Sequence, residues 1–190
     1  MSELIRTFIA IEIPDGIKTA MADVQRELRK TGADVGWTRP EGVHLTLKFL
    51  GPVEAKLMPK LATAVETAVK DEAPLAIEVT GTGVFPNARA PRVVWLGLGG
   101  DINAMSELAR KVDAACEGLG FKPEDRPFRP HLTLGRVKSS KGSKALMDAL
   151  KSFEKLELGG FKADSVSIMR SELKPSGAVY TQIHVMKFKD

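Results

Sequence analysis

The sequence predicts a mixed α and β fold built from two copies of one unit, each with the order strand–helix–strand–helix–strand. The first observation is that the string His-Leu-Thr-Leu occurs twice, at residues 44–47 and 131–134, an offset of 131 − 44 = 87. The second is that strand-like and helix-like apolar patterns alternate along the chain and recur at about the same offset. We therefore expect a single bilobal domain over 1–190, with approximate repeat units 1–87 and 88–190 around a central cleft.

The first unit opens with a strand at residues 6–11, which are rich in β-forming residues. A helix follows, with Asp15 as its expected cap and apolar residues on one face. The strand with the first histidine comes next, then a second amphipathic helix and a strand over 75–84. The helix faces are formed by Ile17, Ala20, Met21, Val24 and Leu28, and by Leu57, Leu61, Ala64, Val65 and Ala68.

The second unit repeats this order, beginning with a strand at residues 93–98. Asp101 is the expected cap of its first helix, and the strand with the second histidine follows. A second helix and a strand over 161–169 complete the unit, and a further strand over 179–188 ends the chain. The apolar helix positions are Ile102, Met105, Leu108, Val112 and Ala115, and Ala145, Leu146, Ala149 and Leu150.

The composition is that of an ordinary globular protein, with 43% hydrophobic residues and a net charge of +4. The charge fits contact with a few phosphates. No apolar run approaches the ~20 residues that a membrane helix needs, and no signal peptide is evident at the N-terminus. The only cysteine, Cys116, is expected to be a buried hydrophobe. We expect a cytoplasmic monomer without membrane contact.

The two histidine strings carry the predicted chemistry. Side chains alternate between the faces of a strand, so each histidine shares a face with the threonine two residues later, while the leucines face the core. His44 with Thr46, and His131 with Thr133, then converge across the cleft. Two imidazoles can remove one proton and deliver another at neutral pH, as in-line displacement at phosphorus requires. The threonine hydroxyls can hold the phosphate oxygens.

Other readings of these histidines have less support. Zinc requires three or four ligands, and although Glu41 is close to His44 in sequence, no carboxylate has a matching place beside His131. A serine hydrolase elbow of the G-x-S-x-G type is absent. The third histidine, His184, lacks a threonine at the right spacing and is expected on a strand surface. We therefore expect neither a metal nor another cofactor.

Three predicted loops combine cations with aromatic residues, at 34–43, 85–92 and 120–130. Each could be a solvated loop with a hydrophobic anchor, or a surface for base stacking and phosphate attraction. The candidate RNA contacts in these loops are Trp37, Arg39, Arg89, Arg126 and Phe128.

The paired strings and their flanking residues resemble the two-histidine phosphoesterase superfamily, and within it the RNA 2′,3′-cyclic phosphodiesterases, also called the 2′-5′ RNA ligase family. The likeness spans nearly the whole chain. It rests on residues 6–11, 44–51, 92–97 and 129–136, and on Ser171-Glu172-Leu173 followed by Tyr180. It implies an α+β fold with antiparallel sheets that line the cleft. It also implies metal-free opening of RNA 2′,3′-cyclic phosphates to 2′-phosphomonoesters, with a weaker, reversible 2′-5′ ligation.

The resemblance also implies residue roles. His44 would be the proton donor and His131 the proton acceptor, an order that the approximate two-fold makes easy to invert. Arg136, five residues after the second histidine, would hold the phosphate, although strand alternation places it with the leucines unless a bulge near Gly135 re-aims it. Phe49 has the matching place in the first unit; it could stack on a base, but core packing is the favoured interpretation. Tyr180 is a further candidate RNA contact.

Three competing functions share much of this evidence. A module that binds RNA ends without turnover needs the basic cleft but not both imidazoles, so the intact His–Thr pairs favour an enzyme. A phosphodiesterase for 2′-5′ oligonucleotides or small cyclic nucleotides would differ only in its loops. Ligation could be the biological role, because the chemistry is reversible. The expected partner in the leading interpretation is an RNA 3′ end with a 2′,3′-cyclic phosphate.

Overall fold

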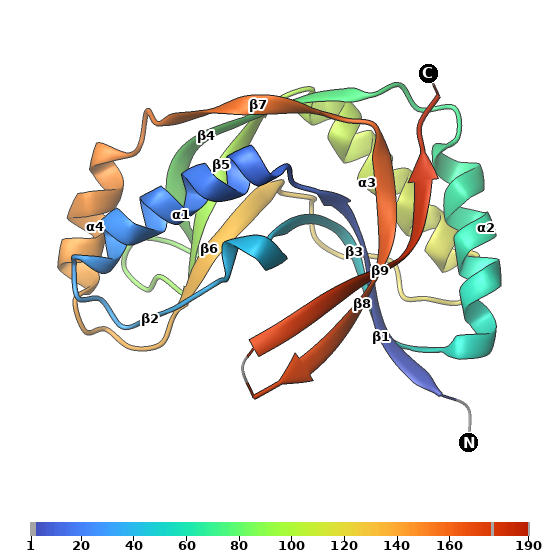
Figure 1. Ribbon diagram of the computed structural model, residues 1–190, viewed down its shortest axis with the longest axis horizontal. Coiled ribbons are helices and arrows are strands. Elements are labelled where there is room, and N and C mark those ends of the chain that lie inside the picture. The colour runs from blue at the N-terminus through green and yellow to red at the C-terminus, as the bar shows by residue number, and fades with distance from the viewer. Residues whose placement is uncertain (1–2, 176, 190) are drawn as a thin grey trace.

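The computed structural model describes residues 3–175 and 177–189; the first two residues, on which the absence of a signal peptide partly depends, lie outside this range. Four α-helices, two short 3₁₀ helices and nine strands follow one another in the described residues (Figure 1). In chain order they are β1 (Leu4–Glu12), α1 (Asp15–Arg29), β2 (Val35–Trp37), η1 (Pro40–Gly42), β3 (His44–Glu54), η2 (Ala55–Leu57), α2 (Met58–Val69), β4 (Leu75–Phe85), β5 (Val93–Gly100), α3 (Ile102–Glu117), β6 (His131–Val137), α4 (Ser143–Ser152), β7 (Glu157–Ala163), β8 (Ser165–Lys174) and β9 (Gly177–Lys187).

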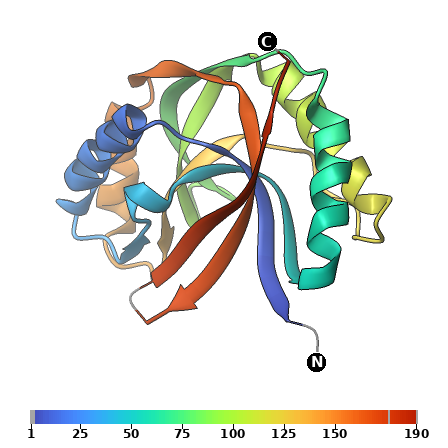
Figure 2. The ribbon, with the colours of Figure 1, turned by 45° about the vertical axis from the view of Figure 1, so that its right-hand side comes forward.

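Within the described part of the chain the strands form two sheets, one of four strands in the order β3-β1-β8-β9 and one of five in the order β2-β6-β5-β4-β7. Every strand pairing is antiparallel, which confirms the predicted α+β class. Each sheet contains strands from both stretches, 1–87 and 88–190, so neither stretch forms a sheet by itself (Figure 2). The two motif strands lie in different sheets, yet Cα atoms of β3 and β6 come within 8 Å of each other.

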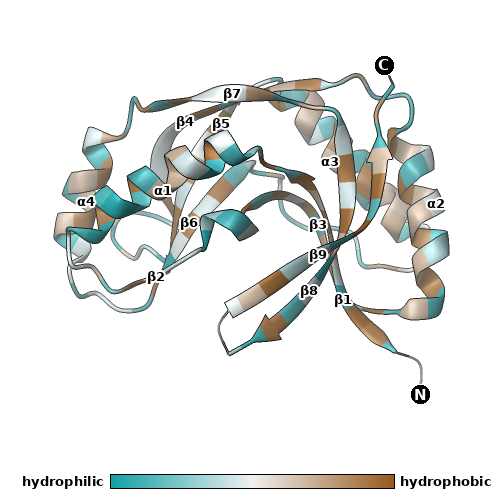
Figure 3. Ribbon diagram, viewed as in Figure 1, coloured by the Kyte–Doolittle hydropathy of each residue, from teal (hydrophilic) through white to brown (hydrophobic). Residues whose placement is uncertain are grey.

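The helices form two pairs, visible on opposite sides in Figure 1. Helices α2 and α3 pack together and against the four-stranded sheet, through β9 and β3. Helices α1 and α4 pack together and against the five-stranded sheet, through β7 and β4. The first helix of each half therefore packs on the sheet that holds the other half's motif strand. Hydrophobic residues alternate with polar ones along the strands, as expected for sheets with one buried face (Figure 3).

Both motif strands anchor in one hydrophobic core. Leu45 and Leu47 of β3 belong to the same buried cluster as Leu132 and Leu134 of β6. This confirms the prediction that the leucines of each string face inward and the histidine and threonine face away from the core.

A β-bulge interrupts each motif strand at the corresponding residue. In β3, Thr46 pairs with Ala10 and Lys48 with Ile9, so Leu47 is the extra residue. In β6, Thr133 pairs with Trp95 and Gly135 with Val94, which leaves Leu134 extra. The offset between the two bulges is 134 − 47 = 87, the same as between the histidines. Because a bulge adds one residue, the alternation of faces is inverted beyond it.

Several sequence expectations need correction. The strand expected over 161–169 is two strands, β7 and β8, which belong to different sheets and are separated at Asp164. Asp15 is not the cap of α1: it is the first helical residue, and Pro14 precedes it. Asp101 does precede α3, but its carboxylate accepts the Ala76 N–H (2.8 Å) in place of a helix N–H. The expected loop over 34–43 contains the short strand β2 and η1.

Two smaller expectations are confirmed. Cys116 is fully buried within α3, and burial raises the pKa of its thiol to about 11. His184 is exposed on β9. Among the described helices, none combines the length and the apolar character that crossing a bilayer would require.

Candidate active site

The outward face of the four-stranded sheet gathers aromatic residues around His44. Phe8 of β1 stacks on the imidazole, with ring centroids 4.4 Å apart. Tyr180 of β9 meets the imidazole edge-on at 4.9 Å and also contacts Phe8. Phe8 and Tyr180 belong to a small apolar cluster that is separate from the main core. We call this surface, with Phe8, His44, Thr46, Phe49 and Tyr180, the first motif face.

The environment of His44 favours its neutral form. Burial is the main cause that lowers the pKa of this histidine to about 4, and the nearby Lys18 ammonium lowers it further. The hydrogen bond to the carbonyl oxygen of Gly42 acts in the opposite direction but is outweighed. In the free protein His44 is therefore a neutral imidazole at pH 7.

The five-stranded sheet presents a second set of aromatic residues around His131. The ring of Phe85, at the end of β4, meets the imidazole edge-on at a centroid distance of 5.1 Å. Trp95 of β5 packs on Phe85 and lies directly over Gly83, where a Cβ atom would come within 2.2 Å of the indole. We call this surface, with Phe85, Trp95, His131, Thr133 and Arg136, the second motif face.

The two histidines are held in the same local way. Nδ1 of His44 lies 2.9 Å from the carbonyl oxygen of Gly42, and Nδ1 of His131 lies 2.7 Å from that of Arg129. A carbonyl oxygen only accepts hydrogen bonds, so each Nδ1 carries a proton. In the neutral ring Nε2 is then the free lone pair, and in the charged ring Nε2 is a donor. Each imidazole thus offers the same nitrogen for proton transfer.

The bulge in β6 turns Arg136 to the second motif face. Arg136 pairs with Val93, which lies two residues before Trp95 and so on the same side of β5. Trp95 in turn pairs with Thr133. Simple alternation from His131 places Arg136 with the leucines, and the structure shows the alternative that a bulge allows.

Phe49 is re-aimed in the same manner, and its expected core packing is wrong. It lies beyond the bulge of β3, opposite Phe8, and is 48% exposed. The guanidinium of Arg6 lies over its ring, 4.7 Å from the centroid. An exposed aromatic ring on the first motif face is consistent with stacking on a base, the alternative considered from the sequence.

The two motif threonines lie where strand alternation predicts. Thr46 pairs with Ala10 on the first motif face and is exposed. Thr133 pairs with Trp95 on the second motif face and is partly buried. Each hydroxyl lies on the same side of its strand as its histidine.

The candidate loop residues are not all brought to these faces. Trp37 pairs with Gly135 and packs against the core and Arg29, so it lies on the other side of the sheet from His131. Phe128 also packs against the core, as a hydrophobic anchor of its loop. The cations Arg39, Arg89 and Arg126 are exposed. Arg126 lies 4.0 Å from Asp125 with its side chain 88% exposed.

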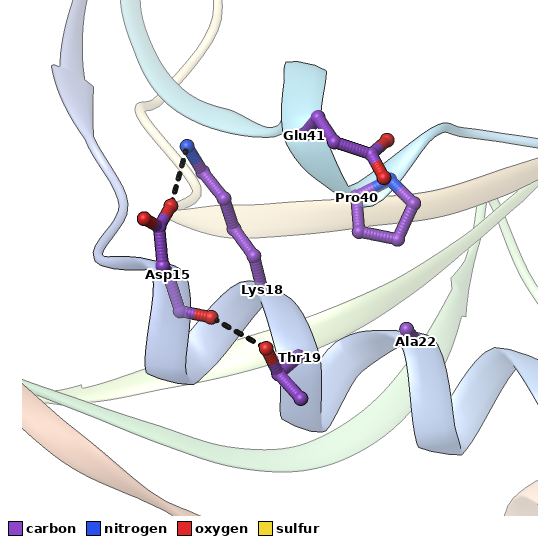
Figure 4. A pocket seen from close by; sticks show the side chains of 6 residues that line it. All are labelled: Asp15, Lys18, Thr19, Ala22, Pro40 and Glu41. Atoms are coloured by element: carbon purple, nitrogen blue, oxygen red, sulfur yellow. Dashed lines mark hydrogen bonds and ion pairs between the residues drawn. The ribbon is translucent and has the colours of Figure 1, made fainter.

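A groove of about 500 Å³ lies beside the first motif, between α1 and η1 (Figure 4). Its lining residues are Asp15, Lys18, Thr19, Ala22, Pro40 and Glu41. Lys18 lies 3.8 Å from Asp15 and is largely covered, with 22% of its side chain exposed. It is the cation that lowers the pKa of His44, and no pattern in the sequence indicated this role.

The aromatic neighbours Phe8, Trp95 and Phe85 were likewise not predicted as site residues. A signal for two of them was available, because 8 + 87 = 95. Phe8, which stacks on His44, thus occupies the place in the first unit that Trp95 occupies in the second. Phe85, by contrast, reaches His131 only through pairing of β4 with β5, which the sequence does not specify.

Comparisons with known proteins identify the family of this chain. A family model described as the 2′-5′ RNA ligase superfamily matches residues 13–175. The chain belongs to the 2′-5′ RNA ligase superfamily. Two curated members named RNA 2′,3′-cyclic phosphodiesterase are similar to it over nearly their full length. The protein from Methanothermobacter thermautotrophicus is 35% identical, and the alignment covers 96% of this chain and 98% of the relative. The protein from Methanocaldococcus jannaschii is 33% identical, and the alignment covers 94% of this chain and 98% of the relative.

Two solved structures share the fold of this chain. TT0787 from Thermus thermophilus has a TM-score of 0.79 at 28% identity, covering 96% of this chain and 97% of its own. E. coli LigT in its apo form has a TM-score of 0.77 at 22% identity, over the full length of both chains. Within the described residues, no group of three or more His, Cys, Asp or Glu side chains is placed to hold a metal ion.

Proposed function

We propose that this protein hydrolyses the 2′,3′-cyclic phosphate at the 3′ end of RNA to a 2′-phosphomonoester, without a metal. The observation that carries the proposal is the matched pair of histidines. Both have Nδ1 fixed by a carbonyl oxygen two residues earlier, and both stand on motif strands that approach each other. The curated relatives named RNA 2′,3′-cyclic phosphodiesterase support this substrate.

In the proposed reaction a water oxygen attacks phosphorus while the bond from phosphorus to the 3′ oxygen breaks. His131 Nε2 takes the proton of the water, and His44 Nε2 gives a proton to the departing 3′ oxygen. The product is a 3′ hydroxyl beside a 2′-phosphate, and the two histidines have exchanged protonation states. When an RNA 5′ hydroxyl takes the place of water as the nucleophile, the same displacement breaks the bond from phosphorus to the 3′ oxygen and joins the two RNAs through a 2′-5′ phosphodiester. This ligation is reversible.

Thr46, Thr133 and Arg136 would hold the non-bridging oxygens of the phosphate. The registers of β3 and β6 support this role, because all three lie on the motif faces. Arg136 would add a charge-assisted hydrogen bond. Phe49 and Tyr180 are the aromatic residues best placed to contact a base. Arg39, Arg89 and Arg126 would attract the RNA backbone.

The burial of His44 favours a second assignment of the same roles. A proton donor must be charged before the reaction, and the pKa of His44 in the free protein is lowered to about 4. As the donor, His44 must gain its proton when the phosphate anion binds beside it, since a nearby negative charge raises the pKa of a histidine. In the exchanged order His44 is the acceptor and His131 the donor.

The test is turnover of a short RNA that ends in a 2′,3′-cyclic phosphate, in the presence of EDTA. The wild-type protein is expected to open the cyclic end to a 2′-phosphate. His44→Ala and His131→Ala are each expected to lose at least ~100-fold in rate, the usual share of an acid or a base. His184→Ala, which alters the histidine outside the motifs, is the matched control and should retain full activity. Binding of the RNA with an intact cyclic end would instead identify a binding module.

A further inference from the structure

Helix α1 carries one polar side chain into the protein interior. Gln25 is 3% exposed, and the other buried residues of the helix are apolar. Its amide Nε2 donates to two backbone carbonyls, that of Thr38 at 2.7 Å and that of Leu134 at 2.8 Å. A buried amide costs stability unless it is hydrogen-bonded. The two carbonyl oxygens are therefore the reason why a glutamine suits this buried position.

One of these partners is the bulge residue of β6. The carbonyl oxygen of Leu134 also accepts the N–H of Thr38 at 2.9 Å. Thr38 follows β2, which pairs with β6 from Gly135 onward. Gln25 therefore ties together the helix, the segment after β2 and the extra residue of the motif strand.

The bulge matters because of what lies beyond it. Without the extra residue at Leu134, strand alternation would turn Arg136 away from His131 and Thr133. With it, Arg136 pairs with Val93 on the second motif face. The interactions that fix the bulge also fix the face on which the guanidinium stands.

We infer that Gln25 is a positioning residue, which locks the bulge at Leu134 and thereby aims Arg136 at the substrate phosphate. The inference rests on the proposed function for the role of Arg136. Gln25 touches neither the substrate nor the histidines. Its effect on the reaction passes through the backbone of β6.

A double-mutant cycle tests this directly, with the cyclic-phosphate RNA as substrate. Gln25→Met keeps the length of the side chain and removes both hydrogen bonds. It is expected to lower kcat/KM by about 10- to 100-fold, the range that misplacement of a binding group produces. In the Arg136→Ala background the same change is expected to cost no more than about 2-fold, because the group that it positions is gone.

The control is Val24→Ala, which weakens the same buried face of α1 but removes no hydrogen bond to β6. It should lower the melting temperature and leave kcat/KM unchanged. Gln25→Asn retains the amide but is one methylene shorter, and it replaces Gln25→Met if the latter does not fold. A loss of the same size in both Arg136 backgrounds, or no loss at all in folded Gln25 variants, would overturn the inference.

Binding of inorganic phosphate to the same proteins separates this inference from the proposed function. If the wild-type protein leaves the cyclic end intact, the proposed function fails, but phosphate binding still reports on Arg136. Gln25→Met and Arg136→Ala are then expected to weaken phosphate binding by similar factors, and the double variant no further. Undiminished phosphate binding by Gln25→Met contradicts the inference.

Discussion

At the scale of single residues, the most informative feature is the difference in surroundings between two histidines with the same backbone contact. His44 packs against the rings of Phe8 and Tyr180, which also contact each other, whereas His131 forms an edge-on pair with the ring of Phe85. The carbonyl contacts occupy Nδ1 of both rings and leave Nε2 as the nitrogen for proton transfer. Burial of the imidazole is the main cause that disfavours its charged form, and the rings of Phe8 and Tyr180 pack against it.

The low pKa of His44 links protein stability to pH. The unfolded chain binds a proton on this residue below the ordinary value of 6.5, while the folded protein does so only near pH 4. Above pH 6.5 His44 is neutral in both states, so protonation does not lower the free energy of unfolding. As the pH falls from 6.5 to 4, the unfolded chain binds a proton that the folded protein does not, and the folded protein loses stability. Relative to His44→Gln, the wild-type protein should lose up to about 3 kcal/mol across this window. Urea unfolding of both proteins at several pH values measures this, and a constant difference would refute the linkage.

The ring of Phe8 is expected to be a main source of this effect. In Phe8→Ala water can reach the imidazole, so the pKa of His44 should rise from about 4 toward its ordinary value. Titration of the imidazole carbon shifts by NMR provides the measurement. Phe49→Ala is the matched control, since that ring is on the same face but 48% exposed and covers Arg6. A similar rise in both variants would show that stacking by Phe8 is not the cause.

At the scale of elements, the two bulges explain which site residues the sequence could predict. His44, Thr46, His131 and Thr133 precede the bulges, and simple alternation places all of them correctly. Phe49 and Arg136 follow the bulges, and alternation misplaces both. A bulge depends on the register of the neighbouring strand and on contacts such as the one from Gln25, and no local pattern in β3 or β6 reveals it.

A second buried polar contact stabilises the other motif strand, β3. Lys48, next to the bulge of β3, is 4% exposed and donates to the carboxylate of Asp113 in α3 and to the carbonyl oxygen of Lys122 (2.6 Å). Asp113 also accepts the N–H of Glu124, in the segment that leads to the second motif. Each motif strand is therefore tied to the first helix of the other half.

Removal of this lysine is expected to destabilise the fold. Lys48→Met leaves the partly buried Asp113 carboxylate without its cation and should reduce the free energy of unfolding by about 3 kcal/mol. The double variant Lys48→Met/Asp113→Leu should recover part of this loss, since no unpaired charge remains. Urea denaturation of the three proteins provides the comparison. A double variant that is less stable than the single one would contradict this explanation.

At the scale of the whole molecule, the sequence predicts the order of elements well but not their assembly into sheets. Helix faces and most strands follow from local periodicity. The assignment of β8 to the four-stranded sheet and of β7 to the five-stranded sheet depends on pairing between distant segments. For the same reason the continuous pattern over 161–169 conceals a change of sheet at Asp164. The duplication of units 1–87 and 88–190 stays a prediction, supported by the shared offset of the histidines and the bulges.

The shared sheets predict that neither half folds alone. A fragment of residues 1–87 lacks two strands of the four-stranded sheet and three of the five-stranded one. Circular dichroism and NMR of the separate fragments, 1–87 and 88–190, should show no cooperative unfolding. An equimolar mixture of the two fragments should regain native structure, because each sheet needs strands from both. Cooperative unfolding of either fragment by itself would mean that the halves are independent domains.

The central claim is that His44 and His131 are an acid and a base acting on one phosphate, and the pH dependence of kcat/KM for the cyclic-phosphate RNA tests it most directly. The wild-type profile should be bell-shaped, and each histidine-to-alanine variant should keep one limb, a different one in each variant. If His44 is the donor, the residual activity of His44→Ala rises with pH because only the base still titrates. If His44 is instead the acceptor, the residual activity of His44→Ala falls as the pH rises. If either variant keeps both limbs, or if both keep the same limb, the acid–base pair is contradicted.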